Sequence, residues 1–299
     1  MKYINKNLTI ESIKAEKLAN KFKTPIYCYS LKKLKENITN FKKNFKSFSP
    51  LICFAVKANP NTNLIKEIKK LGLGADVVSI GEMMKALKAG INPRKIVFSG
   101  IGKTSFEISA AIEKKILLIN AESKSEIIEI EKIAKSKKKV VNIGIRLNPN
   151  TDAKTLNKIS TGKKENKFGV DEKTFFKLVK FCQHSKNIKL NCLSVHIGSQ
   201  ILDHKPYEKM LRVIDKILIK TKHKFEFIDL GGGMGISYGN NKTLNYQKYK
   251  IAIDNFLVKH KVKIIFEPGR SIVGNTGVLI SQVIYIKENK QKNFIILDA

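Results

Sequence analysis

The sequence has 299 residues, 42% of them hydrophobic, so it is long enough to bury a full core. Its formal net charge of +32 comes mainly from lysines spread along the chain, whereas nucleic-acid readers favour arginine interleaved with aromatic residues. We therefore interpret the lysines as a solvated surface and expect neither a nucleic-acid nor a membrane partner, with nonspecific nucleic-acid binding as the alternative. The cysteines lack metal-site spacing, which predicts reduced thiols, no metal and a cytoplasmic protein.

Apolar runs and helical segments alternate along most of the chain, and a strand-like IYCY at Ile26–Tyr29 precedes them. The predicted helices include 63–71, 82–89, 123–135, 171–184, 207–220 and 246–259. The predicted strands are 51–56, 74–79, 95–100, 117–120, 141–148, 189–196, 225–230 and 263–267.

Eight strand–helix units predict a (β/α)₈ barrel of the TIM type over residues 31–272, with an open doubly wound sheet as the rival. Residues 1–30 form an N-terminal extension, and the β-rich run 273–299 reads as the start of a C-terminal β domain to which that extension belongs. The polar stretch Thr151–Phe168 predicts a long loop of the functional or mobile kind.

Lys57 follows the first predicted barrel strand, LICFAV, at the end of the barrel where catalytic groups gather. A surface lysine is the simple interpretation in so basic a chain. At a barrel mouth, however, partial desolvation favours the neutral amine, which can form a Schiff base with a carbonyl such as that of pyridoxal phosphate.

Two loops at the same end predict a phosphate site. The seventh strand runs into DLGGGMG, where Gly231, Gly232 and Gly233 could leave backbone N–H groups free to cradle an anion, although a flexible turn is the alternative. The eighth strand runs into EPGRS, where Glu267, Gly269 and Arg270 offer a carboxylate, a close-approach glycine and a guanidinium.

His196 and Ser199 follow the sixth strand in SVHIGSQ, and Asp76 lies in the second. A lone histidine is usually a satisfied core residue, but this imidazole could stack on an aromatic cofactor ring, and Ser199 could donate to a phosphate. Asp76 could orient a histidine or serve as a hydrogen-bonding partner.

Eight motifs in register resemble the fold-type III pyridoxal-phosphate decarboxylases over nearly the whole chain. They are FAVKANPN, GADVVSIGEM, IVFSGIGKT, RLNPN, ISTGKKENKFGV, HIGSQI, DLGGGMGISY and EPGRSIVGNTGVL.

The resemblance implies a role for each candidate residue. Lys57 would carry pyridoxal 5'-phosphate covalently and His196 would stack on its ring. Ser199, Gly233 and the Glu267–Arg270 loop would hold the phosphate, and Arg270 would also reach toward a substrate carboxylate. Glu267 would pair with the protonated pyridine nitrogen, which favours decarboxylation over the racemisation of related enzymes that place an arginine there.

Within the family, the motifs are most similar to the branch that converts meso-diaminopimelate to L-lysine and CO₂, with an intact protein that forms a homodimer. Alternatives are decarboxylation of ornithine, arginine, lysine or carboxynorspermidine, or binding of the cofactor without turnover. Family members continue beyond the position of Ala299 into an Arg, a Tyr and a Cys-Glu pair for the substrate. We therefore expect the 299-residue chain alone to decarboxylate weakly or not at all.

Overall fold

The computed structural model describes residues 2–153, 162, 167–239 and 242–299. The chain divides into two compact units. One comprises residues 40–271, and the other combines residues 1–39 with 272–299. Helices α2 (Leu31–Asn44) and α10 (Arg270–Val273) run across the two points of division.

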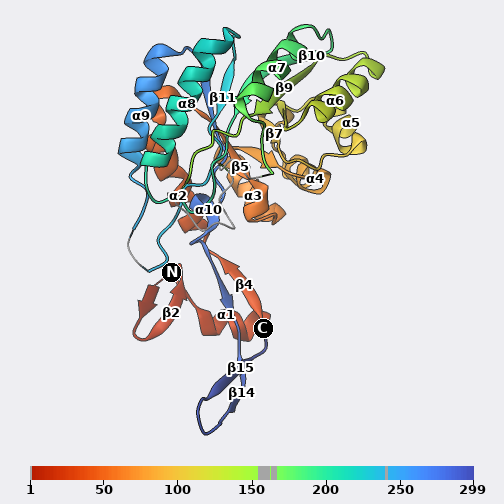
Figure 1. Ribbon diagram of the computed structural model, residues 1–299. Helices are drawn as coiled ribbons and strands as arrows, with labels where there is room; N and C mark the ends of the chain where they lie inside the picture. Colours follow the sequence, from red (N-terminus) through yellow and green to blue (C-terminus); the bar gives the residue numbers. More distant parts are fainter. Residues whose placement is uncertain (1, 154–161, 163–166, 240–241) are drawn as a thin grey trace. The chain divides into compact units, whose positions relative to one another are not determined.

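The larger unit is a closed barrel of eight parallel strands (Figure 1), which confirms the predicted (β/α)₈ fold and excludes the open sheet. Around the barrel the strands follow the order β5 to β12, and β12 pairs with β5. The strands are β5 (Leu51–Ala55), β6 (Gly74–Val77), β7 (Ile96–Phe98), β8 (Leu118–Ala121), β9 (Val141–Arg146), β10 (Ile188–Ser194), β11 (Phe227–Asp229) and β12 (Lys263–Phe266).

Helices alternate with these strands, as the periodicity predicts, and α5 is a helix that the sequence reading did not name. They are α3 (Thr62–Lys70), α4 (Ile80–Lys88), α5 (Ser105–Glu113), α6 (Lys124–Ser136), α7 (Glu172–Gln183), α8 (Lys205–Thr221) and α9 (Tyr246–Lys259). Side chains cap the N-termini of six of them by accepting backbone N–H bonds, each cap stabilising its helix by about 1 kcal/mol. The capping residues are Asn61, Ser79, Thr104, Ser123, Asp171 and Asn245.

The interior of the barrel is apolar in one layer and polar in the next. Cys53, Val97, Leu118, Cys192, Phe227 and Ile265 form a buried cluster contributed by six strands. Since every second residue of a strand faces the same side, the next inward position is two residues further along. There the sequence places Ser99, Asn120, Ser194, Asp229 and Glu267, all of them buried.

Gly144 of β9 makes room for this polar layer. A Cβ atom at Gly144 would lie 2.1 Å from the side-chain oxygen of Asn120, which is closer than any real contact. Because Gly144 has no side chain, the Asn120 amide can lie inside the barrel at this position of β9.

The smaller unit contains short antiparallel pairings. β1 (Lys2–Ile4), β2 (Asn7–Ile10) and β3 (Ile13–Lys14) form one sheet, followed by α1 (Ala15–Phe22). β4 (Ile26–Tyr29), the IYCY strand, pairs with β13 (Gly277–Ile280), and β14 (Val283–Lys287) pairs with β15 (Phe294–Leu297). The predicted strands on both sides of the barrel sequence are thus confirmed.

Within the described residues, no helix combines the length and apolarity that a membrane crossing requires. Most of the predicted loop Thr151–Phe168, and with it much of the ISTGKKENKFGV motif, lies outside those residues.

Candidate active site

Lys57 lies on a short 3₁₀ turn, Val56–Ala58, directly after β5. Its Nζ atom is 2.6 Å from Oδ2 of Asp76, which is fully buried at the end of β6. Burial lowers the pKa of this lysine, but the charge of Asp76 and the hydrogen bond to it outweigh burial and raise the pKa above 10.5. The expectation of a neutral amine is therefore wrong for this state of the protein, because the ammonium has a buried carboxylate partner.

The glycine loop after β11 passes close to the ends of the neighbouring strands. Gly231 and Gly233 adopt positive φ angles of 64° and 87°. A Cβ on Gly232 would lie 2.1 Å from the carbonyl oxygen of Glu267, and one on Gly233 would lie 2.2 Å from that of Gly198. Only glycine fits these positions without displacing the backbone.

Two of the three glycine N–H groups are already engaged inside the protein. The Gly231 N–H donates to Oδ1 of Asp229 at 2.9 Å, and the Gly232 N–H donates to Nδ1 of His196 at 3.2 Å. The prediction that all three N–H groups are free for an anion is therefore wrong. Gly233 retains a donor without a hydrogen-bond partner in the described part of the chain.

His196 follows β10, with a partly exposed side chain next to the glycine loop. Burial, Arg146 and Lys57 lower the pKa of the imidazole well below 6.5, so the ring is neutral near pH 7. Ser199 lies three residues later, beside the Gly198 carbonyl that faces Gly233. A neutral ring with one nitrogen engaged presents an uncharged flat face.

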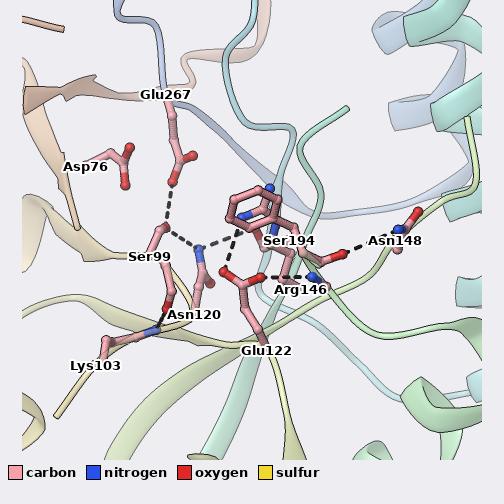
Figure 2. A network of polar contacts seen from close by, with 12 residues as sticks. Asp76, Ser99, Lys103, Asn120, Glu122, Arg146, Asn148, Ser194 and Glu267 are labelled. Carbon is pink, nitrogen blue, oxygen red and sulfur yellow. Dashed lines mark hydrogen bonds and ion pairs between the residues drawn. The ribbon is translucent and has the colours of Figure 1, made fainter. Parts of the chain in front are cut away.

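Glu267 follows β12 and is 8% exposed. Burial and the charges of Asp229 and Asp76 raise the pKa of its carboxyl well above 4.5. The hydroxyl of Ser99 donates to its Oε1 at 3.4 Å, and Ser99 in turn accepts a bond from Asn120 at 3.3 Å (Figure 2). Glu267 therefore holds its proton to a higher pH than a free glutamate does, and it is linked to the polar layer of the barrel.

Gly269 and Arg270 continue the loop after β12. A Cβ on Gly269 would lie 3.0 Å from the Cβ of Ala58, beside Lys57 in the chain. Nη1 of Arg270 donates to the hydroxyl of Tyr238 at 2.6 Å, whereas its Nε is buried without a partner among the described residues. The tyrosine contact was not predicted.

The structure thus brings the predicted residues to one end of the barrel, and it adds several that the sequence reading missed. The additions are the inward-facing Ser99, Asn120, Ser194 and Asp229, together with Arg146. The Nη1 atom of Arg146 is 3.1 Å from Oε1 of the buried Glu122 (Figure 2). A usable signal was present, since a polar residue ends several of the otherwise apolar strands.

Of the two roles expected for Asp76, the structure shows that of a hydrogen-bonding partner, and the group it binds is Lys57. The Oδ1 atom of Asp76 is buried without a hydrogen bond among the described residues. In the same residues, no group of three or more His, Cys, Asp or Glu side chains could hold a metal ion.

Comparisons with known proteins agree with this site. The profile of a family described as "Pyridoxal-dependent decarboxylase, pyridoxal binding domain" matches residues 31–274. The diaminopimelate decarboxylase of Helicobacter pylori is 46% identical over 95% of this chain and 71% of that protein. The Aquifex aeolicus diaminopimelate decarboxylase is 41% identical over 100% of this chain and 72% of that protein. A crystal structure of the Helicobacter pylori enzyme complexed with L-lysine superposes with a TM-score of 0.91 and 46% identity, covering 95% of this chain and 72% of that one.

Proposed function

Because this chain belongs to the pyridoxal-dependent decarboxylase family, we propose that it uses pyridoxal 5'-phosphate to decarboxylate meso-diaminopimelate to L-lysine. The observation that carries the proposal is Lys57, paired with Asp76 at 2.6 Å at the mouth of a closed parallel barrel. The relatives named diaminopimelate decarboxylase, at 46% and 41% identity, support this substrate over other basic amino acids.

The side chains present fit this cofactor. Asp76 Oδ1 and Arg270 Nε are buried polar atoms without partners among the described residues, and the glycines leave space that a Cβ would fill. We assign Lys57 to the aldehyde carbon, Glu267 to the ring nitrogen and His196 to the ring face. Ser199, Gly233, Gly269 and Arg270 would hold the phosphate, and Gly232 would let the loop pass close to the Glu267 backbone. Arg270 would also meet a substrate carboxylate.

Asp76 has a further task in this scheme. Lys57 is charged in this structure and must lose a proton before its nitrogen can attack a carbonyl. The Asp76 carboxylate, 2.6 Å away, is positioned to hold the lysine and to accept that proton. When bound, the cofactor supplies the electron sink that stabilises the carbanion left by CO₂. Glu267 would support that sink at the ring nitrogen.

The proposed organisation follows from this assignment. We propose that residues 31–272 form the cofactor-binding barrel and that residues 1–30 and 273–299 contribute to a β domain. We also propose that the protein is cytoplasmic and forms a homodimer. Its similarity to biosynthetic enzymes supports this part of the proposal. The strands β13, β14 and β15 favour a decarboxylase over a single-barrel protein that binds the cofactor without turnover.

The first test is chemical trapping. The purified chain is incubated with pyridoxal 5'-phosphate, reduced with borohydride and digested, and the peptides are weighed by mass spectrometry. We expect the reduced cofactor on the peptide that contains Lys57, and no stable attachment in Lys57→Ala. Lys85→Ala, which removes a lysine from the outer helix α4, is the matched control and should label like the wild type. Attachment elsewhere would contradict the assignment.

Substrate choice is tested on the same loaded protein. The absorbance of the bound cofactor should change at a lower concentration of meso-diaminopimelate than of L-ornithine or L-lysine. A stronger response to ornithine would favour the alternative within the family.

A further inference from the structure

We propose that Asp229 is a positioning residue for Glu267, and that the two carboxyl groups share one proton, carried by Glu267 and directed at Asp229. Glu267 would then meet the ring nitrogen of the cofactor as an acid that already holds the proton to be delivered. This inference rests on the proposed function only for the identity of the group that Glu267 faces.

The first support is the difference in hydrogen-bond donors around the two carboxyl groups. Asp229 is fully buried at the end of β11 and accepts three bonds: from the Gly231 N–H at 2.9 Å, from Ser194 at 3.0 Å and from Asn120 at 3.0 Å. Glu267 accepts one long bond, from Ser99 at 3.4 Å. Three donors favour a charged carboxylate on Asp229, which leaves the proton on Glu267.

The second support is the placement of the pair on adjacent strands. Asp229 is in register with Ile265 of β12, two residues before Glu267, so the two side chains face the same interior. A short chain of hydrogen bonds links them: Asn120 donates to Asp229 and to Ser99, and Ser99 donates to Glu267. Two buried carboxyl groups on neighbouring strands of one closed barrel cannot both be charged without a large cost, and a shared proton removes that cost.

The charged groups around Glu267 do not change this conclusion. Lys57 favours the carboxylate form of Glu267, but Lys57 is engaged by Asp76, which itself opposes ionisation of Glu267. The thiols of Cys53 and Cys192 lie in the layer below and stay protonated, because burial raises their pKa values well above 9.0.

Delivery moves one proton from Glu267 to the ring nitrogen. On cofactor binding, the Glu267 hydroxyl would turn from Asp229 to the ring nitrogen, its O–H bond would break and an N–H bond would form there, leaving Glu267 as the carboxylate. Asp229 stays charged throughout. Its negative charge behind Glu267 raises the affinity of the ring nitrogen for the proton, since both carboxylates then face the cation.

The inference is tested first without any cofactor. Infrared spectroscopy of the cofactor-free protein follows the C=O stretch of a protonated carboxyl as the pH rises, and its loss in Glu267→Gln assigns the band. In Asp229→Asn the midpoint should move to lower pH by roughly one unit or more. Asp215→Asn, a carboxylate on α8 paired with His260, should leave the midpoint unchanged. An unchanged midpoint in Asp229→Asn, or no such band in the wild type, would overturn the inference.

Ser194→Ala gives a prediction of the opposite sign and covers the case in which Asp229→Asn does not fold. It removes one donor from the charged Asp229, so a second negative charge becomes harder to add. The midpoint should therefore move to higher pH, and a shift to lower pH would contradict the shared proton.

The delivery itself is tested by calorimetry of pyridoxal 5'-phosphate binding in buffers of different ionisation enthalpy. The wild type supplies the ring proton from Glu267, whereas Asp229→Asn must take it from solution, so the variant should take up about one proton more per site. Equal uptake would overturn the delivery step. If the cofactor binds to neither protein, the proposed function fails, and the infrared titration still decides whether the proton is shared.

Discussion

The barrel and the smaller unit both contain strands rich in apolar residues, but these residues are buried in the barrel and exposed in the smaller unit. Every residue of β6 is buried, whereas every residue of β14 and β15 is exposed. Tyr285 and Ile286 are 71% and 65% exposed, although four of the five residues of VIYIK are hydrophobic. A barrel strand has a neighbour on both edges and helices outside, while β14 is paired only with β15 in the structure described here. An apolar run therefore indicates a strand, and the topology decides whether it is buried.

The largest expected effect is a difference in core packing between the two units. Phe266 is fully buried, with its ring centroid 4.7 Å from that of Phe45. Phe266→Ala should lower the free energy of unfolding by about 3–5 kcal/mol, because it leaves a cavity. Phe294→Ala in β15, 47% exposed, should stay within about 0.5 kcal/mol. Denaturant unfolding followed by circular dichroism measures both losses, and equal losses would show that burial does not separate the two phenylalanines.

The two units should also respond to pH with opposite sign. The pKa of Glu267 is raised above 4.5, so its stabilising contribution is complete below that pH and is lost as the pH rises through the folded-state pKa. The pKa of Glu11 is lowered, first by the Lys32 N–H and then by the Ser30 hydroxyl. Its contribution is present above 4.5 and is lost as the pH falls.

Glutamine substitutions isolate the contributions of Glu267 and Glu11 to the free energy of unfolding. The free energy of unfolding of the wild type minus that of Glu267→Gln should fall as the pH rises above 4.5, because the folded-state pKa of Glu267 is raised. The same difference for Glu11→Gln should be smaller, because Glu11 is exposed, and it should decrease as the pH falls below 4.5, because the folded-state pKa of Glu11 is lowered. Slopes of the same sign would show that one of the two carboxyl environments is misassigned.

The smallest expected effect concerns helix caps. Thr104 and Glu107 form a reciprocal capping box at the start of α5, whereas Lys14 before α1 makes no side-chain cap. Thr104→Ala should cost about 1 kcal/mol, and Lys14→Ala should leave stability unchanged. The midpoint of urea unfolding reports both, and a cost at Lys14 would mean that α1 depends on a contact other than a cap.

The sequence alone predicted the barrel well because each strand is a short apolar run and each helix repeats every three to four residues. It also predicted the positions of Lys57, Asp76 and Glu267, because catalytic groups of such barrels follow the strands. It did not predict their protonation states. The charge on Lys57 depends on a carboxylate 19 residues away, and the proton on Glu267 depends on Asp229, a neighbour that only the closed barrel supplies.

The glycine loop shows the same limit. Its composition predicted close approach, and the backbone does approach Glu267 and Gly198. The partners of the N–H groups of Gly231 and Gly232 are Asp229 of the polar layer and His196 after β10, so identifying them required the three-dimensional structure.

The two cysteines in the apolar layer turn the barrel into a reporter of its own opening. Cys53 and Cys192 are fully buried thiols whose pKa values lie well above 9.0, so an alkylating reagent cannot modify them while the barrel is closed. Cys28, on β4, is partly exposed. In the folded protein, slow labelling of Cys53 and Cys192 would therefore measure how often the barrel opens, under conditions where almost all molecules remain folded.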